Sequence, residues 1–291
     1  GKTVLPGRGY AKSDCFKVCP MGKYGSTDND ACTSCGAGTY SNVTTGVDAC
    51  TLCEEGKAQP GEGQTSCSLC AVGKWANVRG STERSSCPPG SSCPREGMST
   101  PEECPIGRYA DTKESRSCRS CPAGRYQNST GSAKCTECEA GTFNAKRGSV
   151  NITDCEMCEA GKYADVGDDS CSECEAGKYG DETGASSCTE CAAGQITNAT
   201  GLMECGDCEA GKYQLTTGQS SCIECEAGKS SRPGATSCSD CAAGNYSSLG
   251  ASSCRRCEAG TYSGSGASTC SECEVGKYND ESGQSSCTEC A

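Results

Sequence analysis

Histidine is absent from the sequence, and large apolar side chains are scarce. Valine, leucine, isoleucine and phenylalanine together account for 21 of the 291 residues, too few to bury a core that offsets the conformational entropy of so long a chain. The absence of histidine also removes the commonest general base and metal ligand. A conventional globular enzyme domain is therefore excluded, and we expect no catalytic residues, no metal site and no cofactor.

Long hydrophobic runs and basic stripes are missing as well. No apolar run approaches the ~20 residues of a membrane span, and no signal-peptide core precedes Gly1, so we expect no membrane span in this chain. The net charge is −12, and residues 158–291 carry 21 acidic against 8 basic side chains. Without a basic stripe to meet phosphates, a nucleic-acid partner is not expected. We interpret the acidic residues as a solvated surface; calcium held between repeats is an alternative, although no loop has a recognisable calcium motif.

Cysteine is abundant instead, with 33 residues or about 11% of the chain, a level typical of disulfide scaffolds. From Cys104 onward nearly all cysteines fall in C-x-x-C pairs, and 12 to 16 residues separate the second Cys of one pair from the first Cys of the next. We count 15 such loops, from Cys19–Cys32 to Cys273–Cys287. This periodicity predicts a one-dimensional array in which each repeat packs on its neighbours.

Three positions recur within the loops. Glycine stands three residues after the opening Cys in all 15 loops, which indicates a positive φ or a close backbone approach. An aromatic ring stands five residues after the opening Cys in 12 loops, the exceptions being Ala58, Ile196 and Ser230. We expect these rings, packed on sulfur and glycine, to form nearly the whole core. A second glycine, four residues before the closing Cys, indicates a turn, so we expect short strands and turns with little helix.

C-x-x-C pairs serve three chemistries: structural zinc sites, thiol–disulfide redox catalysis and disulfide ladders. Redox catalysis needs one activated motif, whereas this chain has a long series of equivalent ones. A zinc array would require a reducing compartment, whereas five N-x-S/T sequons favour secretion and disulfides. Three of the sequons stand in register, two residues after the aromatic position, which predicts a glycan-bearing face. The predicted N-glycosylation sites are Asn42, Asn128, Asn151, Asn198 and Asn245.

The natural pairing joins the second Cys of one pair to the first Cys of the next. Each bond closes a loop of about 15 residues, worth ~3 kcal/mol in the chain-entropy model. Such loops predict small disulfide-rich repeats in an elongated, solenoid-like rod whose stability is a sum over repeats and neighbours. The cysteines expected to pair are Cys19 with Cys32, Cys35 with Cys50, Cys53 with Cys67, Cys104 with Cys118, Cys121 with Cys135, Cys138 with Cys155, Cys158 with Cys171, Cys174 with Cys188, Cys191 with Cys205, Cys208 with Cys222, Cys225 with Cys238, Cys241 with Cys254, Cys257 with Cys270, and Cys273 with Cys287.

The array is interrupted once, where an additional cysteine breaks the spacing. We therefore expect four parts: a degenerate N-terminal half-repeat (1–18), N-terminal cysteine-rich repeats (19–86), an irregular insertion or joint (87–104) and a regular repeat array (105–291).

The number of cysteines is odd, so at least one thiol lacks an intrachain partner. The pairing rule also joins Cys70 to Cys87 in the one remaining loop of the 15, and it leaves Cys15, Cys93 and Cys290 over. A local re-pairing of Cys87 with Cys93, with Cys70 shifted, is an alternative. Cys15 and Cys290 are candidates for an interchain bond that joins chains head to tail, a contact that generates filaments. The other interpretation is that the chain was cut from a longer protein within a repeat.

The recurring pattern C-P/E-x-G-x-Y followed by G-x-x-x-C-x-x-C resembles the ephrin-receptor-like cysteine-rich repeat, and the match covers essentially residues 19–290. It is also similar to the first loop of tumour-necrosis-factor-receptor modules, but it lacks their second, interlocked disulfides, which argues against cytokine binding. The stretch at 87–109 resembles a variant found in very large surface proteins of algae and protists. The resemblance implies an extracellular, crosslinked and elongated protein.

Two functions agree with these observations. The first is an extracellular structural glycoprotein that forms a cell-surface stalk or filament by self-association and carries N-linked glycans. The second is a receptor or adhesin ectodomain that binds a protein or glycan ligand. A ligand site needs local individuality, which is greatest around Trp75, Arg79, Arg84 and Arg95. The loops from Cys158 onward are nearly interchangeable, so the sequence favours the structural function.

Overall fold

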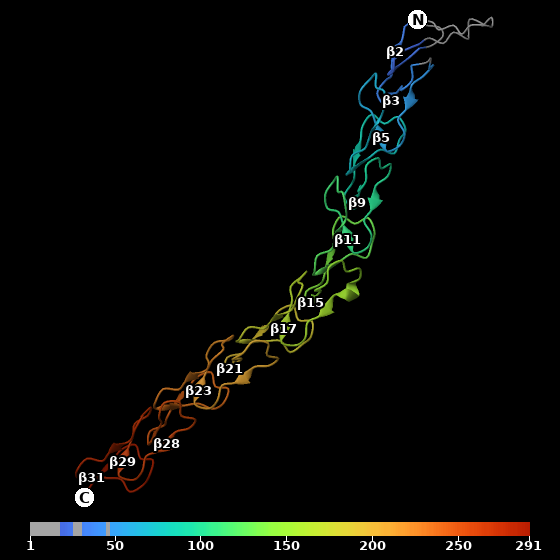
Figure 1. Cartoon of the computed structure of the whole chain (residues 1–291). Helices are drawn as coiled ribbons and strands as arrows, with labels where there is room; N and C mark the ends of the chain where they lie inside the picture. The colour runs from blue at the N-terminus through green and yellow to red at the C-terminus, as the bar shows by residue number, and fades with distance from the viewer. Residues whose placement is uncertain (1–17, 26–30, 45–46) are drawn as a thin grey trace, which may run out of the picture. The chain divides into compact units, whose positions relative to one another are not determined.

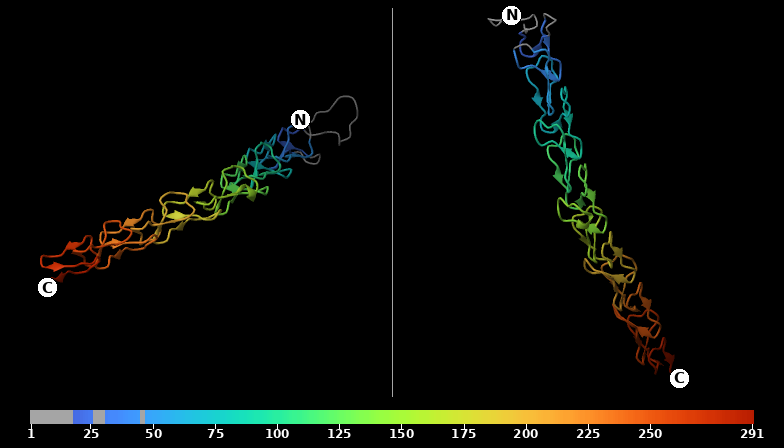
Figure 2. Two further views of the ribbon diagram at one scale, coloured as in Figure 1. Left: turned by 90° about the horizontal axis from the view of Figure 1, so that it is seen from below. Right: turned by 90° about the vertical axis from the view of Figure 1, so that its right-hand side faces the viewer.

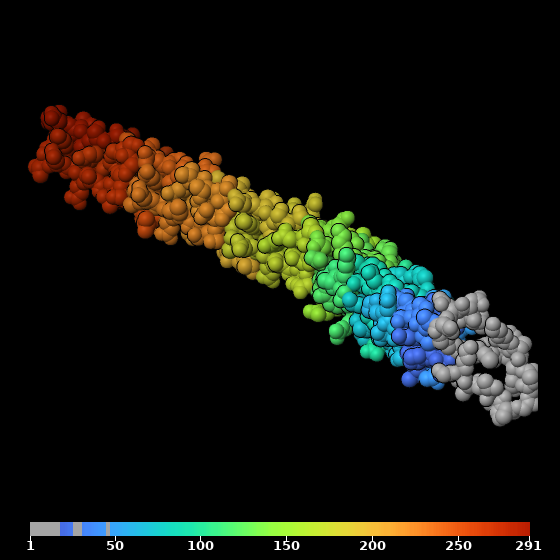
Figure 3. Space-filling model, turned by 90° about the horizontal axis from the view of Figure 1, so that it is seen from above, coloured from blue at the N-terminus to red at the C-terminus, as the bar shows by residue number. Residues whose placement is uncertain are grey.

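The computed structural model describes residues 18–25, 31–44 and 47–291 and divides into two units. Unit 1 comprises the described residues up to Glu137 together with Lys146–Asp154, and unit 2 comprises Cys138–Ala145 together with Cys155–Ala291. Within each unit the colour changes steadily along the ribbon, so the repeats follow one another in chain order (Figures 1 and 2). In the space-filling view, successive repeats of a unit lie directly against one another (Figure 3).

Each repeat is named by its number, 1 to 16, and begins at its opening Cys. The closing position stands three residues before the next opening Cys and is Cys in most repeats. Each repeat has four further positions: the first glycine, three residues after the opening Cys; the ring position, five after it; the core position, six after it; and the second glycine, four before the closing position. The opening cysteines are Cys19, Cys35, Cys53, Cys70, Cys87, Cys104, Cys121, Cys138, Cys158, Cys174, Cys191, Cys208, Cys225, Cys241, Cys257 and Cys273.

Every repeat contains one hairpin of two antiparallel two-residue strands. Hairpins this short are not stable alone in water, so the crosslinks and the contacts between repeats must hold them. The strands of unit 1 are β1 (Lys23–Tyr24), β2 (Thr33–Ser34), β3 (Thr39–Tyr40), β4 (Thr51–Leu52), β5 (Lys57–Ala58), β6 (Ser68–Leu69), β7 (Lys74–Trp75), β8 (Ser85–Ser86), β9 (Ser91–Ser92), β10 (Glu102–Glu103), β11 (Arg108–Tyr109), β12 (Arg119–Ser120), β13 (Arg125–Tyr126) and β14 (Thr136–Glu137). Those of unit 2 are β15 (Thr142–Phe143), β16 (Glu156–Met157), β17 (Lys162–Tyr163), β18 (Ser172–Glu173), β19 (Lys178–Tyr179), β20 (Thr189–Glu190), β21 (Gln195–Ile196), β22 (Gly206–Asp207), β23 (Lys212–Tyr213), β24 (Ile223–Glu224), β25 (Lys229–Ser230), β26 (Ser239–Asp240), β27 (Asn245–Tyr246), β28 (Arg255–Arg256), β29 (Thr261–Tyr262), β30 (Ser271–Glu272), β31 (Lys277–Tyr278) and β32 (Thr288–Glu289).

Helix is almost absent from the described residues. Their one helical element is the short 3-10 helix η2 (Ile152–Asp154). The predicted fold class, small disulfide-rich repeats of short strands and turns, is therefore confirmed. Glycine recurs too often for helix, and each repeat instead closes a tight turn around its first glycine.

The first glycine of each repeat meets two demands at once. In repeat 13, Lys229 N donates to Glu226 O at 3.1 Å, and Gly228 between them has a φ of +88°. A turn of this kind requires a positive φ at its third residue. A Cβ atom on Gly228 would also lie 2.1 Å from the carbonyl oxygen of Gly266 in repeat 15. The sequence offered positive φ and close approach as alternatives, and the structure has both.

Backbone hydrogen bonds join each repeat to the next. Gly228 N donates to Ser247 O at 2.8 Å, Ser247 N donates to Ala267 O at 3.3 Å, and Gly266 N donates to Cys241 O at 2.8 Å. Equivalent bonds recur along both units. Because the first glycine also touches the second glycine two repeats further on, the packing extends beyond the nearest neighbours that the sequence predicted.

The buried core differs from the one expected. The fully buried residues are mainly cysteines and small or polar side chains at the core position, whereas the rings at the ring position are partly exposed and Tyr278 is 49% exposed. The ring position does face sulfur, because Ser230 Oγ, which stands in place of a ring, lies 3.3 Å from Cys254 Sγ of the next repeat. Disulfides and polar side chains fill the space between repeats, and the rings cover them from outside.

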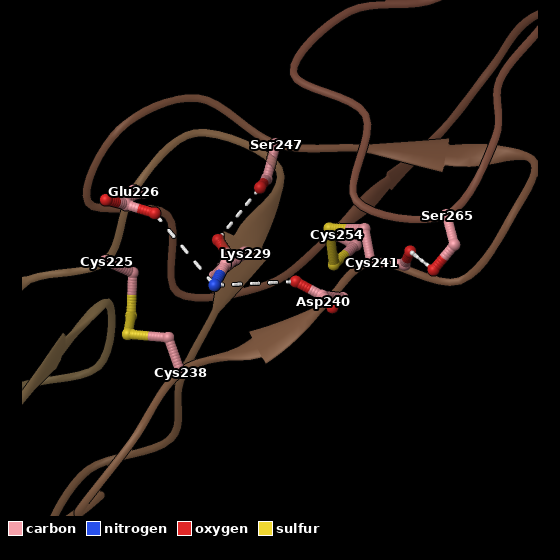
Figure 4. Close-up of polar contacts among 9 residues, drawn as sticks. All are labelled: Cys225, Glu226, Lys229, Cys238, Asp240, Cys241, Ser247, Cys254 and Ser265. Carbon is pink, nitrogen blue, oxygen red and sulfur yellow. Dashed lines mark hydrogen bonds and ion pairs between the residues drawn. A yellow bond between two sulfur atoms is a disulfide. The ribbon is translucent and has the colours of Figure 1, made fainter.

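Several polar core residues donate a hydrogen bond to a carbonyl oxygen of the preceding repeat. Ser247 Oγ donates to Lys229 O at 2.8 Å (Figure 4), and Ser231 Oγ donates to Lys212 O at 2.8 Å. Asn279 Nδ2 donates to Thr261 O at 2.8 Å in the same way. A buried hydroxyl or amide that keeps its hydrogen bond avoids most of the desolvation penalty, so a polar core is compatible with stability here.

Residues 87–104, expected as an insertion or joint, contain a hairpin of the common form. β9 pairs with β10, Gly90 has a φ of +84°, and its Cβ would approach Gly131 two repeats on. Arg84 and Pro101 stand at the two closing positions where the other described repeats have Cys. A role of this segment as a joint stays a prediction, and the predicted half-repeat at 1–18 lies almost wholly outside the described residues.

Candidate functional site

The structure joins the opening Cys of fourteen repeats to the closing Cys of the same repeat. The Cα atoms of each pair lie 5.5–5.8 Å apart. These bonds link the same partners as the sequence pairing rule, from Cys19–Cys32 to Cys273–Cys287. Each disulfide closes a loop of about 15 residues. By restricting the unfolded chain, such a bond stabilises the folded state by ~3 kcal/mol.

Repeats 4 and 5 depart from this pattern. Cys87 pairs with Cys93, the local alternative that the sequence left open, and Cys70 is unpaired and buried. Cys93 stands at the core position of repeat 5 and so lies beside its own opening Cys. Burial raises the pKa of the Cys70 thiol, and the charge of Arg84 opposes this shift in part. Cys290 is unpaired and exposed, while Cys15 lies outside the described residues.

The two unpaired thiols are expected to differ in reactivity. At pH 8 and without denaturant, Cys290 should be alkylated by iodoacetamide at least about tenfold faster than Cys70, because the attacking species is the thiolate and Cys70 is both buried and shifted to a higher pKa. Peptide mass spectrometry of the labelled chain measures both rates. In denaturant the two rates should converge, and equal labelling of the folded chain would contradict the structure around repeat 4.

The residues proposed as a binding cluster do not converge. Arg95 pairs with Glu102 of its own repeat, and Arg84 lies beside the Cys70 thiol. Arg84 lines one hollow with Leu69 and Lys74, whereas Arg95 lines a separate one. Trp75 lies in β7, opposite Ser85 of β8. Within the described residues, the indole Nε1 of Trp75 and the Nε of Arg84 are buried without a hydrogen-bond partner.

The acidic residues beside the opening cysteines pair with the lysines that begin the hairpins. Lys229 Nζ lies 3.9 Å from Glu226 and 3.8 Å from Asp240, one carboxylate on each side (Figure 4). Lys212 lies 3.3 Å from Glu209 in the preceding turn of its hairpin. These groups are exposed, so each pair contributes less than about 1 kcal/mol.

Glu114 occupies the second-glycine position of repeat 6. It is the one non-glycine residue with positive φ (+61°) among the described residues. Its carboxylate accepts a hydrogen bond from Ser86 Oγ at 2.6 Å and lies 3.4 Å from Lys74 Nζ, both in repeat 4. The hydrogen bond from Ser86, together with the hydrogen bond and charge of Lys74, lowers the pKa of Glu114.

Acid should weaken this contact. A carboxyl with a lowered folded pKa stabilises the folded state above its ordinary pKa of 4.5 and loses that contribution as the pH falls through the lower value. Hydrogen exchange of the peptide at 112–118, corrected for the intrinsic rate, should therefore accelerate on acidification below pH about 4.5. In Glu114→Gln the corrected rate should not change with pH. A wild-type rate equally flat in pH would contradict the assigned contact.

The predicted sequons differ in their surroundings. Asn42, Asn128, Asn151 and Asn198 are exposed. Asn245 lies in β27 and is only partly exposed; its Nδ2 donates to Ala242 O at 3.2 Å. Whether any of them carries a glycan stays a prediction, but the first four present an asparagine side chain to solvent.

The described residues contain neither a metal-binding cluster nor a helix suited to a membrane. Residues 18–25, 31–44 and 47–291 contain no group of three or more Cys, Asp or Glu side chains placed to hold a metal ion. No helix in these residues has the length and apolar character needed to cross a membrane.

Comparison with known proteins agrees with the geometry of the repeats. No sequence among curated proteins matches the chain. A family model described as tyrosine-protein kinase ephrin type A/B receptor-like matches residues 38–87, 107–155, 161–201, 194–241 and 260–291, which together exceed half of the chain. The matched segments lie within the array of repeats, and the family consists of cysteine-rich modules. The chain therefore belongs to the ephrin-receptor-like cysteine-rich repeat family.

Proposed function

We propose that the chain is an extracellular structural glycoprotein whose repeats form a stalk or filament at a cell surface. The observation that carries this proposal is the uniformity of the contacts between repeats. First glycine, core position and second glycine make the same backbone hydrogen bonds along both units. Such contacts use backbone rather than individual side chains, so repeats are added without changing the interface.

Fifteen disulfides among the described residues support an oxidising location, since thiols in the cytosol are kept reduced. The alternative function, a receptor or adhesin ectodomain, calls for one repeat with an individual surface. Among the residues with most individuality, Arg84 and Arg95 line separate hollows, and Arg95 pairs with Glu102 of its own repeat, which favours the structural function.

Self-association through Cys290 is the finer part of this proposal. Its support is that Cys290 is exposed and unpaired at the edge of repeat 16. Chains secreted from a eukaryotic host should run as disulfide-linked multimers on non-reducing gels and appear as filaments by negative-stain electron microscopy. Reduction or Cys290→Ser should return monomers. Monomers in the unreduced wild type would refute the filament, and retention of the chain in the cytosol would refute the extracellular location.

A further inference from the structure

One hollow in unit 2 lies beside a hairpin that lacks both the usual ring and a partner side chain. It has a volume of about 640 Å³ and lies between repeats 11 and 12. Ile196 of β21 stands where most repeats carry an aromatic ring, and its cross-strand partner in β22 is Gly206. In repeat 12 the corresponding pair is Tyr213 and Ile223. With neither a ring nor a partner side chain, the surface of repeat 11 is left concave.

The hollow is lined by carboxylates, hydroxyls and the ammonium of Lys212, which pairs with Glu209, around a small apolar floor. Glu204, Asp207, Ser220 and Ser221 contribute oxygens, while Ile196 contributes apolar surface. Within the described residues, the carboxylate of Glu204 makes no hydrogen bond or ion pair. Carboxylates and hydroxyls bind ligand hydroxyl groups, and an apolar floor suits the C–H face or the acetamido methyl group of a sugar. Its size falls within the range of small-ligand sites, about 300–1,000 Å³.

A sequon asparagine lines the same hollow. Asn198 is exposed, and among the described residues its amide has no hydrogen-bond partner. Thr200, the third residue of the sequon, donates its hydroxyl to Glu173 at 2.6 Å and so fixes the sequon against the repeat two before it. By contrast, the amide of Asn245 is held by backbone carbonyls, and Ser247 of that sequon is 2% exposed with its hydroxyl bonded.

We infer that Asn198 carries an N-linked glycan whose first N-acetylglucosamine residues occupy this hollow. The inference rests on the proposed extracellular location. In the transfer, Asn198 Nδ2 forms a bond to the anomeric carbon of an oligosaccharide carried on a polyprenyl diphosphate. The carbon–oxygen bond to the diphosphate breaks, the amide loses one proton, and the diphosphate carrier leaves. The bound sugars then take the place that a ring fills in other repeats.

Asn128 is the matched control, because it stands at the same position of repeat 7, where the ring Tyr126 and its partner Thr136 are both present. The hollow at that hairpin is smaller, about 350 Å³, and Asn128 does not line it. The full chain is secreted from a eukaryotic host and treated, folded and unreduced, with peptide-N-glycosidase in heavy-oxygen water. Mass spectrometry then gives the release rate at each asparagine. Because the enzyme must reach the first sugars, we expect the Asn198 glycan to be released about tenfold more slowly than the Asn128 glycan.

The variant Ile196→Tyr restores the ring found in most repeats and should displace the sugars. Its Asn198 glycan is expected to be released at the Asn128 rate with unchanged occupancy. Equal release rates in the wild type, or an unoccupied Asn198 beside an occupied Asn128, would overturn the inference and leave the proposed location intact. A secreted chain without glycans at any sequon would overturn the inference, because no sugar would then be attached to Asn198. A chain that is never secreted would overturn the proposed function as well.

Discussion

Gly211→Ala is expected to open repeats 12–14 locally, with hydrogen exchange there accelerated about 100-fold or more. Gly211 is the first glycine of repeat 12, with a φ of +86°. A Cβ atom there would lie 2.2 Å from the carbonyl oxygen of Gly250 and 2.7 Å from its carbon. These are backbone atoms of repeat 14, so relief requires one repeat to move relative to another. The overlap adds to the ~1–2 kcal/mol that a left-handed conformation costs a residue with a Cβ.

Gly276→Ala separates the cost of a positive φ from the cost of the steric overlap with another repeat. Gly276 has a φ of +87°, almost the same as Gly211, but no atom lies within 4 Å of a Cβ built on it. We expect this variant to accelerate exchange about tenfold, the part that belongs to φ alone. Hydrogen exchange with mass spectrometry resolves the two repeats in one experiment. If both variants behave alike, the contact between repeats two apart contributes nothing, and packing between nearest neighbours would suffice.

The second large effect is a gain of stability from Arg84→Cys. Arg84 is 14 residues after Cys70, the same separation as in Cys208–Cys222. The hairpin of repeat 4, whose second strand begins directly after Arg84, has the common register, with Trp75 opposite Ser85. A cysteine at position 84 should therefore pair with Cys70 and stabilise repeat 4 by ~3 kcal/mol, equal to roughly a 100-fold slower local opening.

Proteolysis within residues 76–83 measures this opening, and peptide mapping identifies the bond. Arg84→Ser is the control, since it removes the guanidinium without adding a thiol. We expect the serine variant to leave Cys70 unpaired and to gain no protection. A Cys70 that stays free in Arg84→Cys, or a new thiol bonded to Cys87 or Cys93, would show that repeat 4 does not have the geometry of the others.

Much of the fold could be predicted from spacing because each repeat is closed locally. The opening and closing cysteines lie 13–17 residues apart, so one sequence interval defines one loop. The first glycine was equally informative, since its invariance within the chain indicated a demand that only glycine meets. The count of 15 loops omits repeat 5, although Gly90 and the spacing to Cys104 indicate it once Arg84 and Pro101 are interpreted as substituted closing cysteines.

Other features depend on three-dimensional proximity that the sequence does not contain. The approach of Gly211 to Gly250 joins residues 39 positions apart, and periodicity alone cannot distinguish packing on the first neighbour from packing on the second. The partial exposure of the rings is likewise a property of the packed array, and the periodicity does not contain it. The spacing alone allows Cys87 to pair with either Cys70 or Cys93. The structure decides between them, because Cys93 at the core position of repeat 5 lies beside Cys87, the opening Cys of the same repeat.

The hollow of repeat 11 also combines a feature visible in the sequence with features that only the structure shows. The sequence shows that Ile196 replaces a ring, but only the register shows that Gly206 is its partner and that Asn198 stands at the edge. A substitution and a sequon that look independent along the chain therefore belong to one surface.

The most direct test of the central claim is disulfide mapping of the folded, unreduced chain by mass spectrometry. We predict that each opening Cys of the fourteen regular repeats is linked to the closing Cys of the same repeat, with Cys87 linked to Cys93 and Cys70 free. Free thiols throughout, or bonds that join different repeats, would contradict a ladder of locally closed loops and with it the proposed extracellular structural role.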